Sequence, residues 1–228
     1  MCSPYTSRSP VPSPPSDPGD NRAPRGGYHH GDLRAALIDQ AEAVARTKGP
    51  EAVTMRALTR QVGVSANAAY RHFADRAALV QEVTFRAQAA MARAMDAARA
   101  DLPAQADGAA HLTAVGRTYI EAARAEPGLF RTAFTEPADL ELSADPRAAG
   151  DSGLTPFLHL ADALDRMVAD GSLAAELREG AEAPCWSAVH GFSMLVVSGP
   201  LRSAPAEVVD ALAARTVATA VLGITQAP

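Results

Sequence analysis

The sequence lacks several features that define whole classes of protein. Its 228 residues include 2 cysteines and 5% aromatic residues, and no stretch reaches the ~18 uninterrupted apolar residues of a membrane span. Two cysteines exclude a disulfide framework and favour a reduced, intracellular protein. The first residues contain no apolar run of the kind that a secretory signal needs. We therefore expect a cytoplasmic protein that makes no membrane contact.

Strand patterns are missing as well, because apolar and polar residues nowhere alternate with a period of two. Alanine instead supplies 51 of the 228 positions. Alanine is the best helix former and a poor strand former. Since 47% of the residues are hydrophobic, the chain can also bury a sizeable core. The composition therefore predicts an all-α fold.

The formal net charge of -5 is unevenly distributed along the chain. Residues 1–80 carry 10 Lys/Arg and 7 Asp/Glu, a net of +3, whereas residues 81–228 carry 11 and 19, a net of -8. Such a difference between halves indicates two functions on one chain.

Residues 1–27 differ in composition from everything that follows. They contain 7 prolines, 5 serines and 3 glycines, with almost nothing apolar to bury. Such a segment cannot offset its ordering entropy, so we expect a disordered N-terminal arm. The remainder reads as helices joined by short loops, with a polar, mobile loop at about 136–153. The expected helices cover about 32–48, 55–62, 65–72, 76–100, 104–125, 128–135, 155–170, 174–198 and 206–223.

The segment from Thr54 to Leu79 predicts a helix-turn-helix. Thr54 and Ser65 are good N-cap residues for two short helices, and Gly63 between them can adopt a left-handed turn. Asp75 would cap the long helix that follows. The apolar residues that would lock the two short helices together are Leu58, Val62, Val64 and Ala69.

The outward side of the second short helix suits the major groove of double-stranded DNA, because it begins with small and polar residues. This side carries Ser65, Ala66, Asn67, Tyr70, Arg71 and His72. At the start of the first helix, Thr54 and Arg56 are placed to hold a phosphate. A two-helix corner of an ordinary bundle would show the same spacing. The local charge favours DNA, since residues 22–76 hold 9 Lys/Arg against 5 Asp/Glu.

These residues resemble the DNA-binding domain of the TetR family of transcriptional regulators. The resemblance rests on Tyr28-His29-His30-Gly31-Asp32-Leu33-Arg34, Val53-Thr54-Met55-Arg56-Ala57-Leu58, Gly63-Val64-Ser65 and Tyr70-Arg71-His72-Phe73-Ala74-Asp75-Arg76-x-x-Leu79. It implies a three-helix DNA-binding domain over residues 28–90, a homodimer, and a C-terminal domain over residues 91–228 that binds an inducer and dimerises. Thr59 and Ala69 depart from the family's common pattern, at positions that pack the two short helices together.

The same resemblance assigns roles to individual side chains. Thr54 and Arg56 would touch phosphates, and the groove would be faced by Ser65, Ala66, Asn67 and Tyr70. The flanking DNA backbone would be contacted by Arg71, His72 and Arg76.

The C-terminal half contains a W-x-x-x-H-G motif at Trp186, His190 and Gly191, which resembles the signature of one TetR subgroup. Trp186 and His190 are four residues apart and therefore share a helical face. One interpretation is an apolar ligand pocket with a single polar anchor. Its lining would be Phe130, Phe134, Trp186, His190 and Met194. The other interpretation is that Trp186 is ordinary core and His190 a buried, hydrogen-bonded histidine.

The other candidate sites in the sequence give little support to a further function. His29 and His30 are adjacent and diverge on a helix, and no Cys or carboxylate cluster completes a metal site. Cys185 and His190 point about 140° apart on one helix, which excludes a thiol nucleophile with its base. Glycine-rich phosphate loops and nucleophile elbows are absent from the sequence. We therefore expect no metal, no cofactor and no enzyme activity. A contribution of the arm arginines Arg8, Arg22 and Arg25 to DNA binding would be electrostatic at most.

The sequence thus predicts a dimeric DNA-binding regulator, a repressor released by a small apolar or amphipathic ligand through a population shift. The alternatives are a helical protein-interaction module without DNA binding and an enzyme that uses the C-terminal pocket. We expect the last two helices, with Val217, Val221 and Ile224 on one stripe, to form the dimer seam. In the alternative interpretation that stripe belongs to the monomer core.

Overall fold

A computed structural model of the chain describes residues 30–135 and 143–226. Within these ranges every regular element is a helix, which confirms the predicted all-α fold. Short 3-10 helices at Pro50–Ala52, Pro146–Ala148, Ala175–Leu177 and Pro200–Ser203 lie between some of the α-helices. The α-helices are α1 (His30–Lys48), α2 (Met55–Val62), α3 (Ala66–Tyr70), α4 (Arg76–Ala100), α5 (Gly108–Ala125), α6 (Pro127–Thr135), α7 (Pro156–Ala169), α8 (Glu182–Val197) and α9 (Ala206–Gly223).

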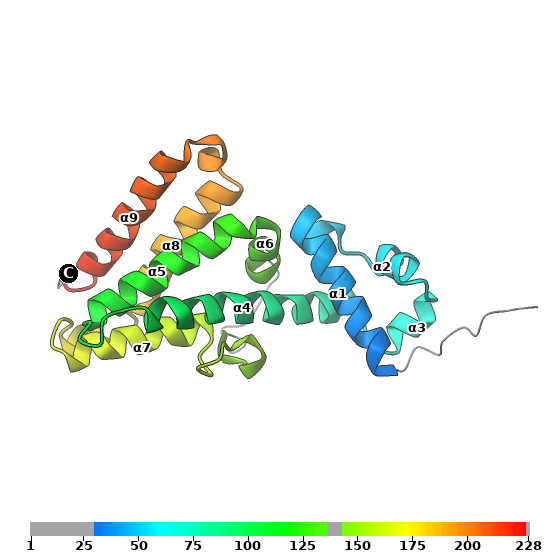
Figure 1. Ribbon diagram of the computed structural model, residues 1–228, viewed down its shortest axis with the longest axis horizontal. Helices are drawn as coiled ribbons and strands as arrows, with labels where there is room; N and C mark the ends of the chain where they lie inside the picture. The colour runs from blue at the N-terminus through cyan, green and yellow to red at the C-terminus, as the bar shows by residue number, and fades with distance from the viewer. Residues whose placement is uncertain (1–29, 136–142, 227–228) are drawn as a thin grey trace, which may run out of the picture.

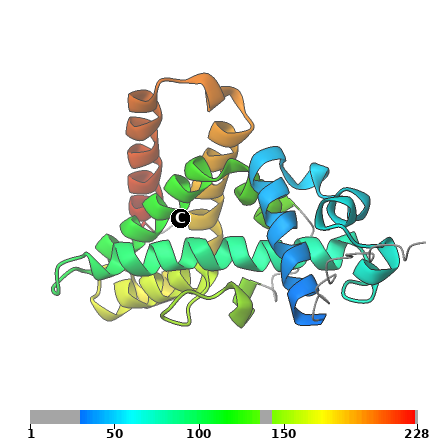
Figure 2. The same ribbon diagram turned by 45° about the vertical axis from the view of Figure 1, so that its right-hand side comes forward.

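The helices form two groups joined by α4. The helices α1, α2 and α3 lie together at one end of the molecule, and α4 leads from them into a larger bundle (Figure 1). In that bundle α5 contacts α4, α7, α8 and α9, so it is the central helix. The helices α8 and α9 run side by side in opposite directions as an outer pair (Figure 2).

Each group has its own hydrophobic core, and two helices contribute to both. In α4, Val83 belongs to the N-terminal core and Met91 to the C-terminal core. In α6, Leu129 belongs to the N-terminal core and packs toward α1. The next residue, Phe130, belongs to the C-terminal core and packs toward α5. The expected domain boundary near residue 90 therefore falls inside α4 rather than in a linker.

Side-chain caps begin the helices where the sequence predicted them. The side-chain oxygens of Thr54, Ser65 and Asp75 accept hydrogen bonds from the backbone N–H three residues later, at 3.3, 3.2 and 2.8 Å. Each bond satisfies an amide that the first helical turn leaves without a partner. Gly63 ends α2 with φ of 76°, the left-handed conformation that an L-residue adopts only with strain.

Two predicted helices are too long at their N-terminal ends. The helix expected at 104–125 begins at Gly108, because Asp107 caps it through a 2.8 Å bond to the Ala110 amide. The helix expected at 174–198 begins at Glu182, after a 3-10 helix and a turn at Gly180 with φ of 74°. Pro184 explains the second error, since proline is tolerated in the first turn of a helix but not in its interior.

The polar segment after α6 is also more ordered than expected, in the part that the structure describes. Residues 136–142 lie outside the described residues, but residues 143–153 pack against α4. Ala148 is fully buried, and the Arg147 guanidinium lies 4.0 Å from the ring centroid of Phe85. The expected arm, residues 1–27, likewise lies outside the described residues.

Candidate functional site

The helix-turn-helix is closed by a small apolar contact between α2 and α3. Leu58 and Ala69 have no exposed surface, and Val62 and Val64 pack against the same core. Thr59, the other departure from the common TetR pattern, is buried and its hydroxyl donates to the Arg56 carbonyl at 3.3 Å. The motif is therefore tightly packed with these two residues in place.

The side chains that the sequence assigned to DNA lie mostly on the surface of α2 and α3. His72 is half-buried, whereas Tyr70 is 51% exposed, a large value for an aromatic residue. The exposed members are Thr54, Arg56, Ser65, Ala66, Asn67, Tyr70 and Arg71. They leave α3 with an outward face of small and polar side chains around one ring.

Arg76 has a different environment from the other assigned residues. Its guanidinium donates to the Val53 carbonyl at 2.7 Å and to the Pro50 carbonyl at 2.6 Å. These bonds fasten the start of α4 to the connection between α1 and α2. Arg76 thus supports the geometry of the motif, a role that its position in the sequence did not predict.

A cavity of about 880 Å³ lies among α4, α5, α6, α7, α8 and α9. Of the five residues predicted for a pocket, Phe134, Trp186 and His190 line it. Phe130 is buried behind the lining, with its ring centroid 5.0 Å from Phe134 and 5.7 Å from His190. Met194 packs against the C-terminal core and does not line the cavity. The cavity wall around these residues is therefore largely aromatic and aliphatic.

Tyr119 of α5 connects Trp186 and His190, the two residues of the W-x-x-x-H-G motif that share a face of α8. The Trp186 indole N–H donates to the Tyr119 hydroxyl at 3.3 Å, and that hydroxyl lies 2.9 Å from His190 Nδ1. Burial raises the pKa of Tyr119 and lowers the pKa of His190, so both side chains are neutral near pH 7. We call Tyr119, Trp186 and His190 the Tyr119 cluster.

Tyr119 was not predicted from the sequence, although one signal was present. Leu112, Val115 and Tyr119 are spaced three and four residues apart, which puts the tyrosine on the buried stripe of α5. That spacing does not say which helix faces the stripe, and Tyr119 and His190 are 71 residues apart in the chain.

Cys185 also lines the cavity, but its chemistry is inert. Burial raises the pKa of its thiol to about 11, so the nucleophilic thiolate is absent at neutral pH. Within the part of the chain that the structure describes, no group of His, Cys, Asp and Glu could hold a metal ion. None of the described helices is long and apolar enough to cross a membrane.

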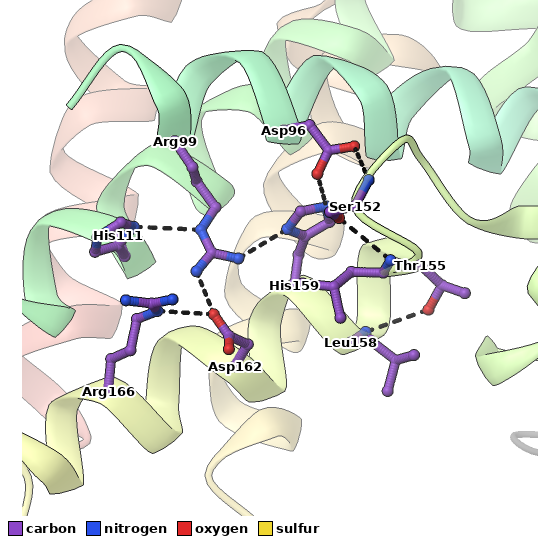
Figure 3. Close-up of polar contacts among 10 residues, drawn as sticks. Asp96, Arg99, His111, Ser152, Thr155, Leu158, His159, Asp162 and Arg166 are labelled. Carbon is purple, nitrogen blue, oxygen red and sulfur yellow. Dashed lines mark hydrogen bonds and ion pairs between the residues drawn. The ribbon is translucent and has the colours of Figure 1, made fainter.

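A second polar cluster lies away from the cavity, at the end of α4 (Figure 3). Arg99 is its centre and joins three helices. Its guanidinium donates to His111 Nδ1 of α5 at 3.2 Å, contacts His159 Nδ1 of α7 at 2.9 Å, and pairs with the Asp162 carboxylate. We call Asp96, Arg99, His111, His159 and Asp162 the Arg99 cluster.

The protonation states of the Arg99 cluster follow from its hydrogen bonds. Arginine can only donate, so Nδ1 of His111 and of His159 must accept, and both rings are neutral. Burial lowers the pKa of both histidines, and the charge of Arg99 lowers it further. Nε2 of His159 lies 3.1 Å from Asp96, although the approach is too oblique for a hydrogen bond.

The short helix α6 ties the cavity to the N-terminal helices. Phe134 at one end lines the cavity, whereas Gly128 at the other lies so close to α1 that a Cβ there would overlap the Ala45 carbonyl oxygen. Two ion pairs strengthen this contact, Arg131 with Glu51 and Arg46 with Glu126. A displacement of α6 by a ligand would therefore reach α1 directly.

The stripe expected to be a dimer seam faces inward instead. Val217 and Ile224 are buried in the C-terminal core, and Val221 packs against it, because α9 turns this face toward α5 and α8. A different apolar set is exposed on the outer helix pair. It consists of Leu195 of α8 at 45% and of Val208, Leu212 and Leu222 of α9 at 43%, 37% and 66%.

Family profiles match both parts of the chain. A profile described as bacterial regulatory proteins, tetR family, matches residues 37–83. A second, described as tetracyclin repressor-like, C-terminal domain, matches residues 112–220. The matches include the helix-turn-helix and most of the helices around the cavity. None of the curated proteins compared with the chain matches it.

Solved structures share the fold over nearly the whole chain. A protein of unknown function from Rhodococcus sp. RHA1 is 24% identical, with a TM-score of 0.67, covering 89% of this chain and 100% of that one. A TetR-family transcriptional regulator from Pectobacterium atrosepticum is 20% identical, with a TM-score of 0.61 and coverage of 90% and 100%. A TetR variant from Acinetobacter baumannii AYE in complex with minocycline is 15% identical, with a TM-score of 0.60 and coverage of 85% and 98%.

Proposed function

We propose that this chain, which belongs to the TetR family of bacterial regulatory proteins, is a repressor released from its operator by a small molecule. As a TetR-family transcriptional regulator, the chain has a helix-turn-helix and a helical C-terminal domain. The observation that supports release by a small molecule is the position of α6, which has one end in the cavity wall and the other against α1. A site for a ligand is thereby mechanically connected to the DNA-binding helices.

In this proposal α3 enters the major groove. Ser65, Ala66, Asn67 and Tyr70 face the base edges, and Asn67 is the side chain best able to read an adenine. Phosphate contacts come from Thr54 and Arg56 on one side and from Arg71 and His72 on the other. We leave Arg76 out of this set, since its hydrogen bonds to the carbonyls of Pro50 and Val53 hold the side chain against the connection between α1 and α2.

A second copy of the chain would complete the DNA-binding unit. The exposed leucines and valine of α8 and α9 suit an apolar interface between two outer helix pairs. Val208, Leu212 and Leu222 fall within about 80° of one another around α9, so they form one continuous face. A dimer places two α3 helices on half-sites ~34–36 Å apart, and a small change in that spacing weakens binding.

Ligand release then works by a shift of population. A molecule in the cavity that is bound better when α6 is displaced stabilises the form whose α3 helices are wrongly spaced for DNA. The complex of minocycline with a TetR variant of the same fold supports the binding of a small molecule by this chain. Because a repressor acts on DNA inside the bacterial cell, we infer a cytoplasmic location.

A gel-shift titration against the DNA upstream of its own gene tests this proposal. We expect binding that falls steeply between low and moderate salt, because phosphate contacts release counterions. Arg71→Ala should weaken binding to all DNA sequences by a similar factor, whereas Asn67→Ala should change which base the protein prefers. The matched control is Arg117→Ala, which removes an exposed arginine of α5 far from α3.

The outcomes separate the alternatives. If no duplex is bound at any salt, the chain is not a DNA-binding repressor, and a protein-interaction module becomes the better account. If Arg117→Ala weakens binding as much as Arg71→Ala does, net charge rather than the α3 face carries the affinity.

A further inference from the structure

We propose that the cavity takes a neutral, largely apolar molecule with one hydrogen-bond acceptor, such as an ester or ketone carbonyl, and that Nε2–H of His190 recognises this acceptor. The inference rests on the proposed function in one respect, that the cavity is where the regulator senses a ligand. It adds the chemical class of that ligand.

The Tyr119 hydroxyl has one hydrogen and can also accept. Trp186 Nε1 is a donor only, so the 3.3 Å contact uses a lone pair of the hydroxyl oxygen. The hydroxyl hydrogen is then available for His190 Nδ1, which lies 2.9 Å away. In this arrangement Nδ1 accepts, and the neutral imidazole carries its proton on Nε2.

The reverse arrangement is less favourable. If Nδ1–H donated to Tyr119, the hydroxyl hydrogen would need another acceptor, and the described residues offer it none. Nε2 would become an acceptor instead of a donor, and in neither form does it have a partner among the described residues. The difference is therefore the buried Tyr119 hydroxyl hydrogen, which would be left unsatisfied at a cost in free energy. The structure therefore assigns the proton to Nε2.

Nε2–H is thus a donor without a protein partner among the described residues, on a side chain that lines the cavity. The rings of Phe134 and Trp186 lie beside it, with centroids 5.6 and 6.3 Å from that of His190. A ligand that fills this apolar space satisfies the donor only if it brings an acceptor. A hydrocarbon of the same size would displace water from Nε2–H and offer nothing in return.

The electrostatics of the lining favour a neutral ligand. Among the described residues that line the cavity, Asp75 is the one with a fixed charge, and its carboxylate already caps α4. His190 is neutral because burial lowers its pKa. A carboxylate group in the cavity would therefore be desolvated without a counter-charge, and an ammonium group would find one only at Asp75, at the start of α4.

Other polar lining groups are less able to select a ligand. The Thr84 hydroxyl and the Gln88 amide donate to the carbonyls of Thr132 and Ala133 on α6, at 3.2 and 3.5 Å. Gln81 lines the cavity from α4 on a long, flexible side chain. His190 differs from it because Tyr119 fixes the ring and its tautomer.

The binding test uses Trp186, the only tryptophan of the chain, as a fluorescent reporter. Methyl octanoate, nonane, octanoate and octyltrimethylammonium are titrated into the full-length protein, its His190→Phe variant and its Gln81→Leu variant. The Phe side chain keeps the ring but removes the donor. The Gln81→Leu variant is the matched control, since it also replaces one polar lining residue with an apolar one.

We expect methyl octanoate to bind more tightly than both charged probes. The ratio of the Kd for nonane to the Kd for methyl octanoate should fall roughly threefold to tenfold in His190→Phe, the worth of one hydrogen bond. In Gln81→Leu the ratio should keep its wild-type value. The inference is overturned if the ratio is the same in His190→Phe, if octanoate binds most tightly, or if none of the four probes binds.

Nitrogen NMR of the unaltered protein gives a second test, which does not depend on whether the variants fold. We expect a protonated Nε2 and an unprotonated Nδ1 for His190 at neutral pH, and the opposite tautomer or an imidazolium would overturn the assignment. Neither readout involves DNA. Selective ester binding without release of DNA would contradict the proposed function and leave this inference standing, whereas release without ester selectivity would do the reverse.

Discussion

The Tyr119 cluster and the Arg99 cluster show two uses of a buried histidine within one helical bundle. In the Arg99 cluster, His159 is 1% exposed and lies between a guanidinium and a carboxylate from other residues of the cluster. In the Tyr119 cluster, His190 is half-buried and has one neutral partner. Both histidines have a pKa lowered by burial, so titration behaviour alone does not distinguish them.

The difference lies in what surrounds each ring. No residue of the Arg99 cluster lines the cavity, and its charged groups are paired across α4, α5 and α7. Such a cluster fixes the relative positions of helices. The Tyr119 cluster borders an 880 Å³ space and retains a donor for a molecule from outside. A polar side chain that borders a cavity therefore indicates a ligand-binding role. A polar side chain whose partners are all charged or polar groups of the protein indicates a structural role in holding helices together.

The largest expected effect comes from removing the centre of the Arg99 cluster. Arg99→Met should lower the free energy of unfolding by about 2–3 kcal/mol, because Asp162 and two histidine acceptors lose their partner. This value is below the usual cost of breaking a fully buried pair, since the Asp162 side chain is 35% exposed. Urea unfolding measures it. Arg166→Met is the matched control and should cost less than about 1 kcal/mol, since Arg166 pairs with Asp162 at the surface. Equal losses of unfolding free energy in the two variants would contradict the inference that Arg99 holds the cluster together.

An intermediate effect is expected from acid. Burial lowers the pKa of His159 below its ordinary 6.5, so the unfolded chain binds a proton more readily than the folded one. Stability should therefore fall as the pH drops below about 6.5, by at most about 1.4 kcal/mol per pH unit for each such histidine. His111 contributes in the same direction.

Denaturation series at several pH values check this dependence. The pKa values of Asp96 and Asp162 are also lowered, because hydrogen bonds from their neighbours outweigh the effect of burial, and their contribution is lost at a lower pH. His159→Gln should flatten the dependence between pH 7 and 5 more than His190→Gln does. A steeper dependence in His159→Gln would contradict the assigned neutral state.

The smallest effect on stability is expected in the Tyr119 cluster. His190→Phe should change the free energy of unfolding by about 1 kcal/mol or less, since it removes a single neutral hydrogen bond. The same variant should lose its preference for the ester, as described above. A loss of stability comparable with that of Arg99→Met would mean that His190 supports the bundle and that the contrast between the two clusters is false.

The local parts of the molecule were predictable because their signals lie within a few residues. The caps at Thr54, Ser65 and Asp75 and the turn at Gly63 are short-range features, and each is confirmed. The same reasoning failed at residues 174–181, where the alanines favoured a helix and Pro184 was given too little weight. Fold class follows from composition and periodicity, so it needed no knowledge of tertiary contacts.

The long-range parts were not predictable, because one sequence does not say which helix faces which. Trp186 and His190 were found through their spacing on one helix, whereas their partner Tyr119 lies on another. The Arg99 cluster joins residues from three helices and has no motif at all. The stripe of Val217, Val221 and Ile224 was identified correctly as apolar, but its direction depends on how α9 packs.

The division of α6 between two cores has a consequence for how the molecule loses its structure. Leu129 and Phe130 are consecutive, so melting of either core pulls a helix out of the other. Heat should therefore unfold the described helices in a single calorimetric transition, although a chain with two cores could show two. A molecule of this kind cannot relax its sensor by local melting, and any signal that passes through α6 has to travel as a movement of intact helices.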